Sequence, residues 1–365
     1  MTTIIATPHR AFSRSLLFVA AAFALGVLVV SARAVPQAAT SGAPESLQDT
    51  GLYSDFAALQ VDDRHLAFSP QYPLWTDGAA KRRWISLPPG TAIDASDPDA
   101  WSFPVGTRLW KEFSFAGQRV ETRFMERRPD GWLYAAYAWS ADGREAQRVS
   151  PKGRRGAYPL GGGRSHAIPG VSDCKVCHQG GRSEVLGFSA IQLSPQRDPG
   201  ALHAEPPSGV DLNVLIERGL LVELPASLIE APPGIGAASA TERAALGYLH
   251  GNCGHCHNEQ GPLRNVGLFL RQAAGATVEH TIASTLNHPV RKPAPGQSHD
   301  ATLRIEPQHP DRSALMQRIA SRVPALQMPP LGTELVDRQA VDLLRRWIEQ
   351  REPVPPTFPP QETRH

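Results

Sequence analysis

Residues 239–257 read SATERAALGYLHGNCGHCH, and this stretch joins a helix start to a chemical motif. Ser239, with Glu242 three positions later, forms a capping box, a pattern with which helices begin. Leu246 and Leu249 continue the helical spacing toward the cysteines. The sequence therefore predicts a helix that ends where the motif begins.

The chain has four cysteines, and they form two pairs, each with two residues between the thiols and a histidine directly after. The first motif is Cys174, Cys177 and His178, and the second motif is Cys253, Cys256 and His257. Two thiols at this spacing can form thioethers to one haem while the adjacent histidine ligates its iron. Random placement of these residues in a chain of this composition gives roughly 0.0015 such motifs. The sequence therefore predicts two covalently bound haems of the c type.

Three other uses of paired cysteines explain the sequence less well. Zinc needs four ligands per site, and a histidine directly after the second cysteine is poorly placed for tetrahedral coordination. A thioredoxin-type dithiol needs no such histidine and lies in a βαβ unit, which the sequence does not indicate. Disulfides are common in exported proteins, but here every pair is followed by histidine.

From residue 239 to residue 348 the chain resembles class I cytochrome c. The order is a helix, the second motif, a long loop-rich stretch, a Met-Pro-Pro sequence, and a last amphipathic helix with apolar residues at helical spacing over 336–348. The resemblance implies that His257 is the proximal ligand of the second haem and Met328 its distal ligand. The other methionine after the motif, Met316, suits a core position.

Residues 51–160 have a different character, and six of the seven tryptophans lie between positions 75 and 139. Apolar and aromatic runs alternate there with turn signals, which predicts strands over residues 81–87, 107–115, 118–127 and 132–139. We therefore expect a multidomain chain: an N-terminal mostly-β domain, a small sandwich or barrel, followed by a mostly-α cytochrome c domain. Aromatic residues at strand spacing are more typical of a core than of a binding surface.

Four stretches of this region are similar to a family of exported bacterial proteins that is known mainly as uncharacterised. They are residues 73–78 (PLWTDG), 84–90 (WISLPPG), 103–107 (FPVGT) and 120–123 (VETR). That family joins such a β domain to a Cys-x-x-Cys-His motif. The similarity therefore indicates an architecture rather than a reaction.

The remaining segments follow from composition. Residues 1–34 place arginines before an apolar run and an Ala-Arg-Ala site, which is typical of a cleaved signal peptide, with an uncleaved membrane anchor as the alternative. The other predicted segments are a flexible lead-in (35–50), a β-rich domain (51–160), a first haem-attachment segment with a helix at 211–221 (161–224), a linker (225–238), the cytochrome c domain (239–351) and a proline-rich tail (352–365).

The sequence offers three candidates for the sixth ligand of the first haem. His166 lies in a glycine-rich stretch, residues 151–172, which we expect to be a loop able to fold back onto the iron. Met125, in a predicted strand, is a second candidate, and a water-bound iron is a third. Methionine raises the potential of a haem, so ligation by His166 would direct electrons from the first haem to the second.

Removal of residues 1–34 changes the formal charge from +2 to −1, because three arginines and no acidic residue are lost. A near-neutral protein is a poor partner for nucleic acid. The short basic runs at 81–83 and 154–155 are expected to be solvated. Contact with a membrane is expected only if the N-terminal segment remains uncleaved.

These observations predict a periplasmic electron-transfer protein that passes single electrons between redox partner proteins. A dihaem enzyme of the peroxidase type is the first alternative, with Glu121 and Glu126 as available acids. A second alternative is a β module that binds a ligand while the haems relay electrons. An exposed patch of Trp75, Trp101 and Trp110 would favour this second alternative.

Overall fold

The computed structural model describes residues 42–291, 293 and 302–352. The predicted signal peptide (1–34), the first part of the predicted lead-in and residues 353–365 of the predicted tail lie outside the described residues. The described chain contains an antiparallel β region followed by a more helical region, which confirms the predicted fold class.

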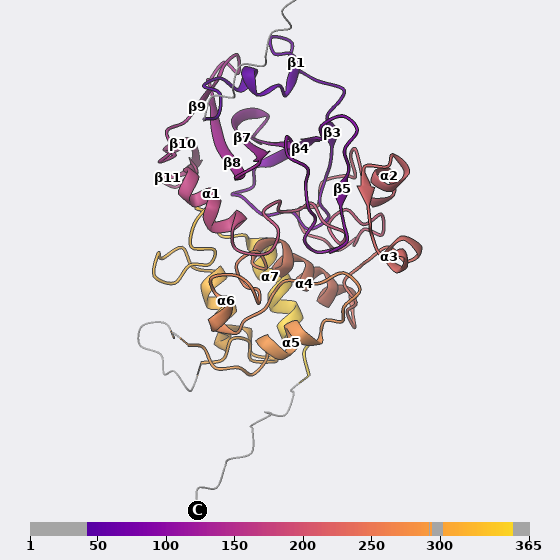
Figure 1. Ribbon diagram of the computed structural model, residues 1–365. Helices are drawn as coiled ribbons and strands as arrows, with labels where there is room; N and C mark the ends of the chain where they lie inside the picture. The colour runs from indigo at the N-terminus through magenta and orange to yellow at the C-terminus, as the bar shows by residue number, and fades with distance from the viewer. Residues whose placement is uncertain (1–41, 292, 294–301, 353–365) are drawn as a thin grey trace, which may run out of the picture. The chain divides into compact units, whose positions relative to one another are not determined.

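The β region is built on a six-stranded antiparallel sheet in the order β3-β4-β6-β7-β8-β9 (Figure 1). Its strands are β3 (Leu66–Ala67), β4 (Ala80–Ser86), β6 (Arg108–Phe115), β7 (Gln118–Arg128), β8 (Gly131–Trp139) and β9 (Ala146–Arg148). Four of them are the predicted strands, with ends within one residue of the prediction. The sheet is a meander whose edges are β3 and β9.

Three two-stranded sheets accompany the meander. They pair β1 (Tyr53–Asp55) with β2 (Gln60–Val61), β5 (Ile93–Asp94) with β12 (Leu221–Val222), and β10 (Arg154–Gly161) with β11 (Arg164–Ile168). The last pair corrects the prediction of a loop over residues 151–172, since most of that stretch is a hairpin. Phe115 stacks on Tyr158 at 4.7 Å between ring centroids, which ties the hairpin to the meander.

The helices lie mostly in the second half of the chain. They are η1 (Leu47–Thr50), α1 (Val171–His178), α2 (Leu212–Glu217), α3 (Ala226–Glu230), α4 (Ala240–Asn252), η2 (Arg264–Val266), α5 (Glu279–Thr285), η3 (Pro310–Arg312), α6 (Ala314–Ile319) and α7 (Arg338–Glu349). Two of them fall in segments predicted to be unstructured. Helix η1 buries Leu47 completely within the lead-in, and α3 lies inside the predicted linker.

Helices α4 and α7 pack against each other (Figure 1). Ser239 caps α4, because its Oγ accepts a hydrogen bond from the Glu242 amide at 3.1 Å; the Glu242 carboxylate in turn accepts from the amide of Ala238, one residue before the cap. The apolar face of α7 is buried, with Trp347 only 1% exposed. Met316 is buried in the same core, which confirms its predicted role.

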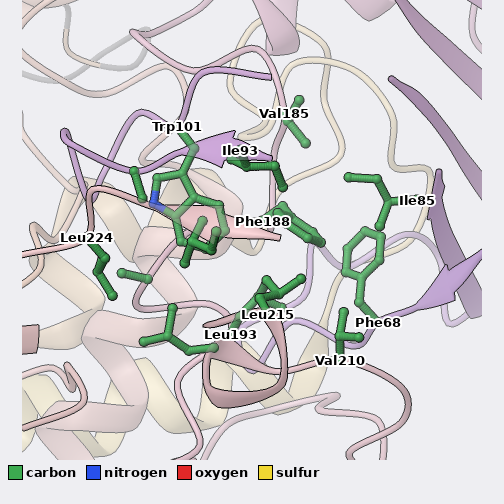
Figure 2. Packing of buried hydrophobic residues seen from close by; sticks show 14 of the residues in the cluster. Phe68, Ile85, Ile93, Trp101, Val185, Phe188, Leu193, Val210, Leu215 and Leu224 are labelled. Atoms are coloured by element: carbon green, nitrogen blue, oxygen red, sulfur yellow. The ribbon is translucent and has the colours of Figure 1, made fainter. Parts of the chain in front are cut away.

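The segment after the first motif belongs to the core of the β region. Phe188 packs edge-on against Phe68 and Trp101, at 4.7 and 5.5 Å between ring centroids (Figure 2). Burial of this segment fixes the position of α1, which lies just before it in the chain. Within the described residues no helix is both long enough and apolar enough to cross a bilayer.

Candidate functional site

The first motif forms the last turns of helix α1, which packs against strand β8. Nδ1 of His178 lies 2.6 Å from the carbonyl oxygen of Glu184. A carbonyl only accepts hydrogen bonds, so Nδ1 carries the proton and Nε2 keeps its lone pair for a metal. Burial lowers the pKa of His178 to about 4, which keeps the ring neutral, as a ligand must be. The Tyr134 ring lies 5.4 Å from the His178 ring.

The second motif begins where α4 ends, and Cys253 and Met328 line one pocket there. The other walls come from α4, from the start of α7 and from the segments around Ile319 and Trp75. Burial lowers the pKa of His257 to about 4, and its buried Nδ1 has no hydrogen-bond partner among the described residues. Met328 therefore lies in the same pocket as Cys253 of the second motif.

The two motifs lie against each other. Sγ of Cys256 is 3.9 Å from the carbonyl oxygen of Val176, which lies between the two cysteines of the first motif. Asn258 joins them further, because its Nδ2 donates to the carbonyl of Gly180 at 2.8 Å and to the carbonyl of Gly254 at 3.0 Å. Asn258 is 1% exposed. Sequence reasoning missed it, since a single asparagine after a motif carries no recognisable signal.

Residues 73–78 contact the helix before the second motif and the segment after Met328. The amide of Trp75 donates to Oδ1 of Asn252, the last residue of α4, at 2.7 Å. Oδ1 of Asp77 accepts from the amides of Glu334 and Leu335 at 2.7 and 2.9 Å, in the segment that follows Met328. The β region therefore holds the helix before the second motif and the loop after the predicted methionine ligand.

His166 lies in strand β11 rather than in a flexible loop, and it is 1% exposed. Its Nε2 is 3.0 Å from Oε1 of Glu121, and its Nδ1 is 3.6 Å from Oδ2 of Asp77. Burial lowers the pKa of His166, but the two carboxylates raise it by more, so its value is above the usual one. To ligate an iron, His166 would have to leave one of these carboxylates. Met125, the other candidate, is half-buried in β7 and packs against the core.

The two acids named for a peroxidase are held in ion pairs. Glu121 is fully buried and accepts from Arg123 at 2.6 Å, and Glu126 pairs with Arg108 and Arg128 at 3.0 Å each. The tryptophans named for an open patch are buried: Trp75 is 9% exposed, Trp101 4% and Trp110 1%. Their burial removes the observation that would have favoured a ligand-binding β surface.

The residues of both motifs fit covalent haem. All four thiols are free and partly buried. In the first motif the histidine tautomer is fixed by a backbone carbonyl, an arrangement that metal-ligating histidines favour. Among the described residues, no three His, Cys, Asp or Glu side chains gather as a metal site of their own.

No protein-family model, no curated protein and no solved structure matches this chain.

Proposed function

We propose that this protein is an exported c-type cytochrome with two haems, which passes single electrons between redox partner proteins in the periplasm. The observation that carries the proposal is the contact between the two motifs, with Cys256 Sγ 3.9 Å from the Val176 carbonyl oxygen. Centres that exchange electrons must lie close together, and here the two attachment segments are neighbours.

Cys174 and Cys177 would hold one haem with His178 as its ligand. Cys253 and Cys256 would hold the other, between His257 and Met328. When bound, each haem takes up and releases one electron at its iron. The chain supplies the environment: burial keeps both histidines neutral, and the Glu184 carbonyl orients the His178 ring.

The first test is the number of covalent haems per chain, measured by pyridine haemochrome absorbance against protein concentration after expression with c-haem maturation machinery. We expect two in the natural chain, and one in each of Cys177→Ala and Cys256→Ala. Ser172→Ala, an exposed change on helix α1, should keep both. One haem or none in the natural chain would overturn the dihaem proposal.

A second test separates a carrier from an enzyme. In a carrier both irons have six ligands, so carbon monoxide binds the reduced protein slowly or not at all. Rapid, tight binding to one haem would show an open iron, and a dihaem enzyme would then replace the carrier as the better proposal.

A further inference from the structure

One face of the meander carries a row of cations. Arg83 on β4 is directly opposite Lys111 on β6, and Lys111 is directly opposite Arg123 on β7. Lys81, two residues before Arg83, points to the same face because side chains alternate along a strand. Like charges directly opposite each other destabilise a sheet, so this row has an energetic cost.

Two residues of the row, Lys81 and Arg83, are buried, contrary to the expectation that residues 81–83 are solvated, and Lys111 and Arg123 are half-buried. Lys81 is 8% and Arg83 5% exposed, whereas the side chain of Arg82, on the other face of β4, is 53% exposed. The alternation of β4 explains the difference, since it turns every second residue of the basic run inward.

The carboxylates near the row do not balance it. Glu205 pairs with Arg83 at 2.7 Å, and Glu121 pairs with Arg123 at 2.6 Å while also contacting His166. Across the described part of the chain Lys111 forms no ion pair; its ammonium lies 5.0 Å from the centre of the Phe113 ring.

Two donors of the row, Nη2 of Arg83 and Nε of Arg123, are also buried and have no acceptor among the residues that the structure describes. Burial, followed by the charges of Arg83, Arg123 and Lys81, holds the pKa of Lys111 well below its usual value. Buried charges normally have partners, so the row lacks an anion.

The row lies beside the first motif. Arg123 interacts electrostatically with Cys174 and Cys177, and Lys111 with Cys177 and His178. Tyr134, which contacts the His178 ring, lies on the next strand of the sheet, β8. An anion bound to this row would therefore sit next to the cofactor proposed for the first motif.

We infer that Arg83, Lys111 and Arg123 form a binding site for carboxylate-type anionic oxygens next to the first motif. Such oxygens have two sources: the propionate groups of a haem attached at Cys174 and Cys177, or a small soluble carboxylate. Only the first source rests on the proposed function. Either one would supply charge-assisted hydrogen bonds to the unpaired guanidinium and ammonium donors.

The sign of a stability change tests the site. In the haem-loaded protein, Lys111→Met removes one cation from the row. If an anion is bound, the loss of its partner lowers the urea midpoint. If the row holds no anion, relief of repulsion raises the midpoint, and that result would overturn the inference.

Two control variants accompany this measurement. Lys111→Arg keeps the charge and should keep the midpoint. Arg108→Gln removes a cation from the other face of β6, where Glu126 still has Arg128 as a partner, and should also leave the midpoint unchanged. Should Lys111→Met not fold, Lys111→Gln, which keeps a polar group at the position, takes its place.

Two further experiments identify the source of the anion. If the anion is a small soluble carboxylate, sodium formate stabilises the natural chain in a saturable manner, and Lys111→Met abolishes this stabilisation. If haem propionates are the anion, added formate leaves the stability of the natural chain unchanged. Lys111→Met then no longer destabilises a chain that also carries Cys174→Ala and Cys177→Ala. The haem count of the natural chain is measured separately, so failure of the dihaem proposal is distinguishable from failure of the anion site.

Discussion

Sγ of Cys256 lies 3.9 Å from the carbonyl oxygen of Val176, so the second cysteine of one motif contacts a residue between the two cysteines of the other. The two motifs are 79 positions apart in the chain, yet they are in contact at this point. A protein that only needed two independent haems would not require this contact. The contact therefore favours a function in which the two centres act together.

Asn258 is the side chain that holds this contact. Its Nδ2 donates to the carbonyl of Gly180, two residues after the first motif, and its Oδ1 accepts from the amides of Gln260 and Gly261 at 3.0 and 2.7 Å. Asn258→Ala leaves these buried groups without partners, and we expect it to lower the free energy of unfolding by about 1–3 kcal/mol. Urea denaturation of the haem-loaded protein measures this. Asn213→Ala, at an exposed site of α2, is the control, and equal stability of the two variants would contradict the assigned role.

Gly247 lets helix α4 approach the β region. A Cβ built at this position would lie 2.1 Å from the Tyr72 ring, which is 3% exposed and therefore has no room to move. Gly to Ala in a helix normally stabilises by up to about 1 kcal/mol. Here we expect the opposite sign, a loss of about 1–3 kcal/mol from overpacking. Thermal and urea unfolding measure this loss, with Gly234→Ala as a near-neutral control, because no atom of the described chain lies within 4 Å of a Cβ built at Gly234.

The strands and the last helix could be predicted because their patterns are local. Strand β6 is a run rich in apolar and aromatic residues, and α7 places Leu343, Leu344 and Trp347 on one face. The hairpin of β10 and β11 could not be predicted, since its residues are mostly polar or glycine and mostly exposed or half-buried. Strand pairing and the contact of Tyr158 with Phe115 stabilise the hairpin, and such contacts leave no signal in a local sequence pattern.

The candidate site divides in the same way. The cysteines and histidines were found because their spacing is itself the chemical requirement. The contact between the motifs and the hydrogen bonds of Asp77 to the segment after Met328 depend on residues 80 or more positions apart meeting in space. The stretch at 73–78 was noticed as a resemblance, but only the structure shows that Trp75 contacts the end of α4 and that Asp77 contacts the segment after Met328.

His250 makes stability depend on pH. Its Nδ1 accepts a hydrogen bond from the Gln272 amide at 3.0 Å, which requires a neutral ring, and burial lowers its pKa from 6.5 to about 3. The unfolded chain then binds a proton before the folded one does. The stabilising contribution is therefore complete above pH 6.5 and is lost as pH falls toward 3.

Between pH 6.5 and pH 5 this contribution amounts to about 1.5 kcal/mol. Urea unfolding at both pH values should show a smaller loss for His250→Gln than for the natural chain. His288→Gln, at an exposed position, serves as the comparison and should keep the natural slope. If His250→Gln keeps that slope as well, the assignment is wrong.

Asp77 is expected to hold Met328 in position for the second iron. Its Oδ1 accepts from the amides of Glu334 and Leu335, and its backbone has φ 49°, a conformation that Asp and Asn tolerate better than most residues. Asp77→Ala removes the acceptor and strains the backbone, which we expect to cost about 1–3 kcal/mol. The loop then moves and the iron–sulfur bond weakens.

The absorbance band of methionine-ligated ferric haem reports this change, and it should decrease in Asp77→Ala and be absent in Met328→Ala. Asp77→Asn, which keeps an oxygen acceptor and tolerates the same φ, should retain most of the band, as should Asp130→Ala in an exposed turn. A full band in Asp77→Ala would show that the loop holds its position without the β region.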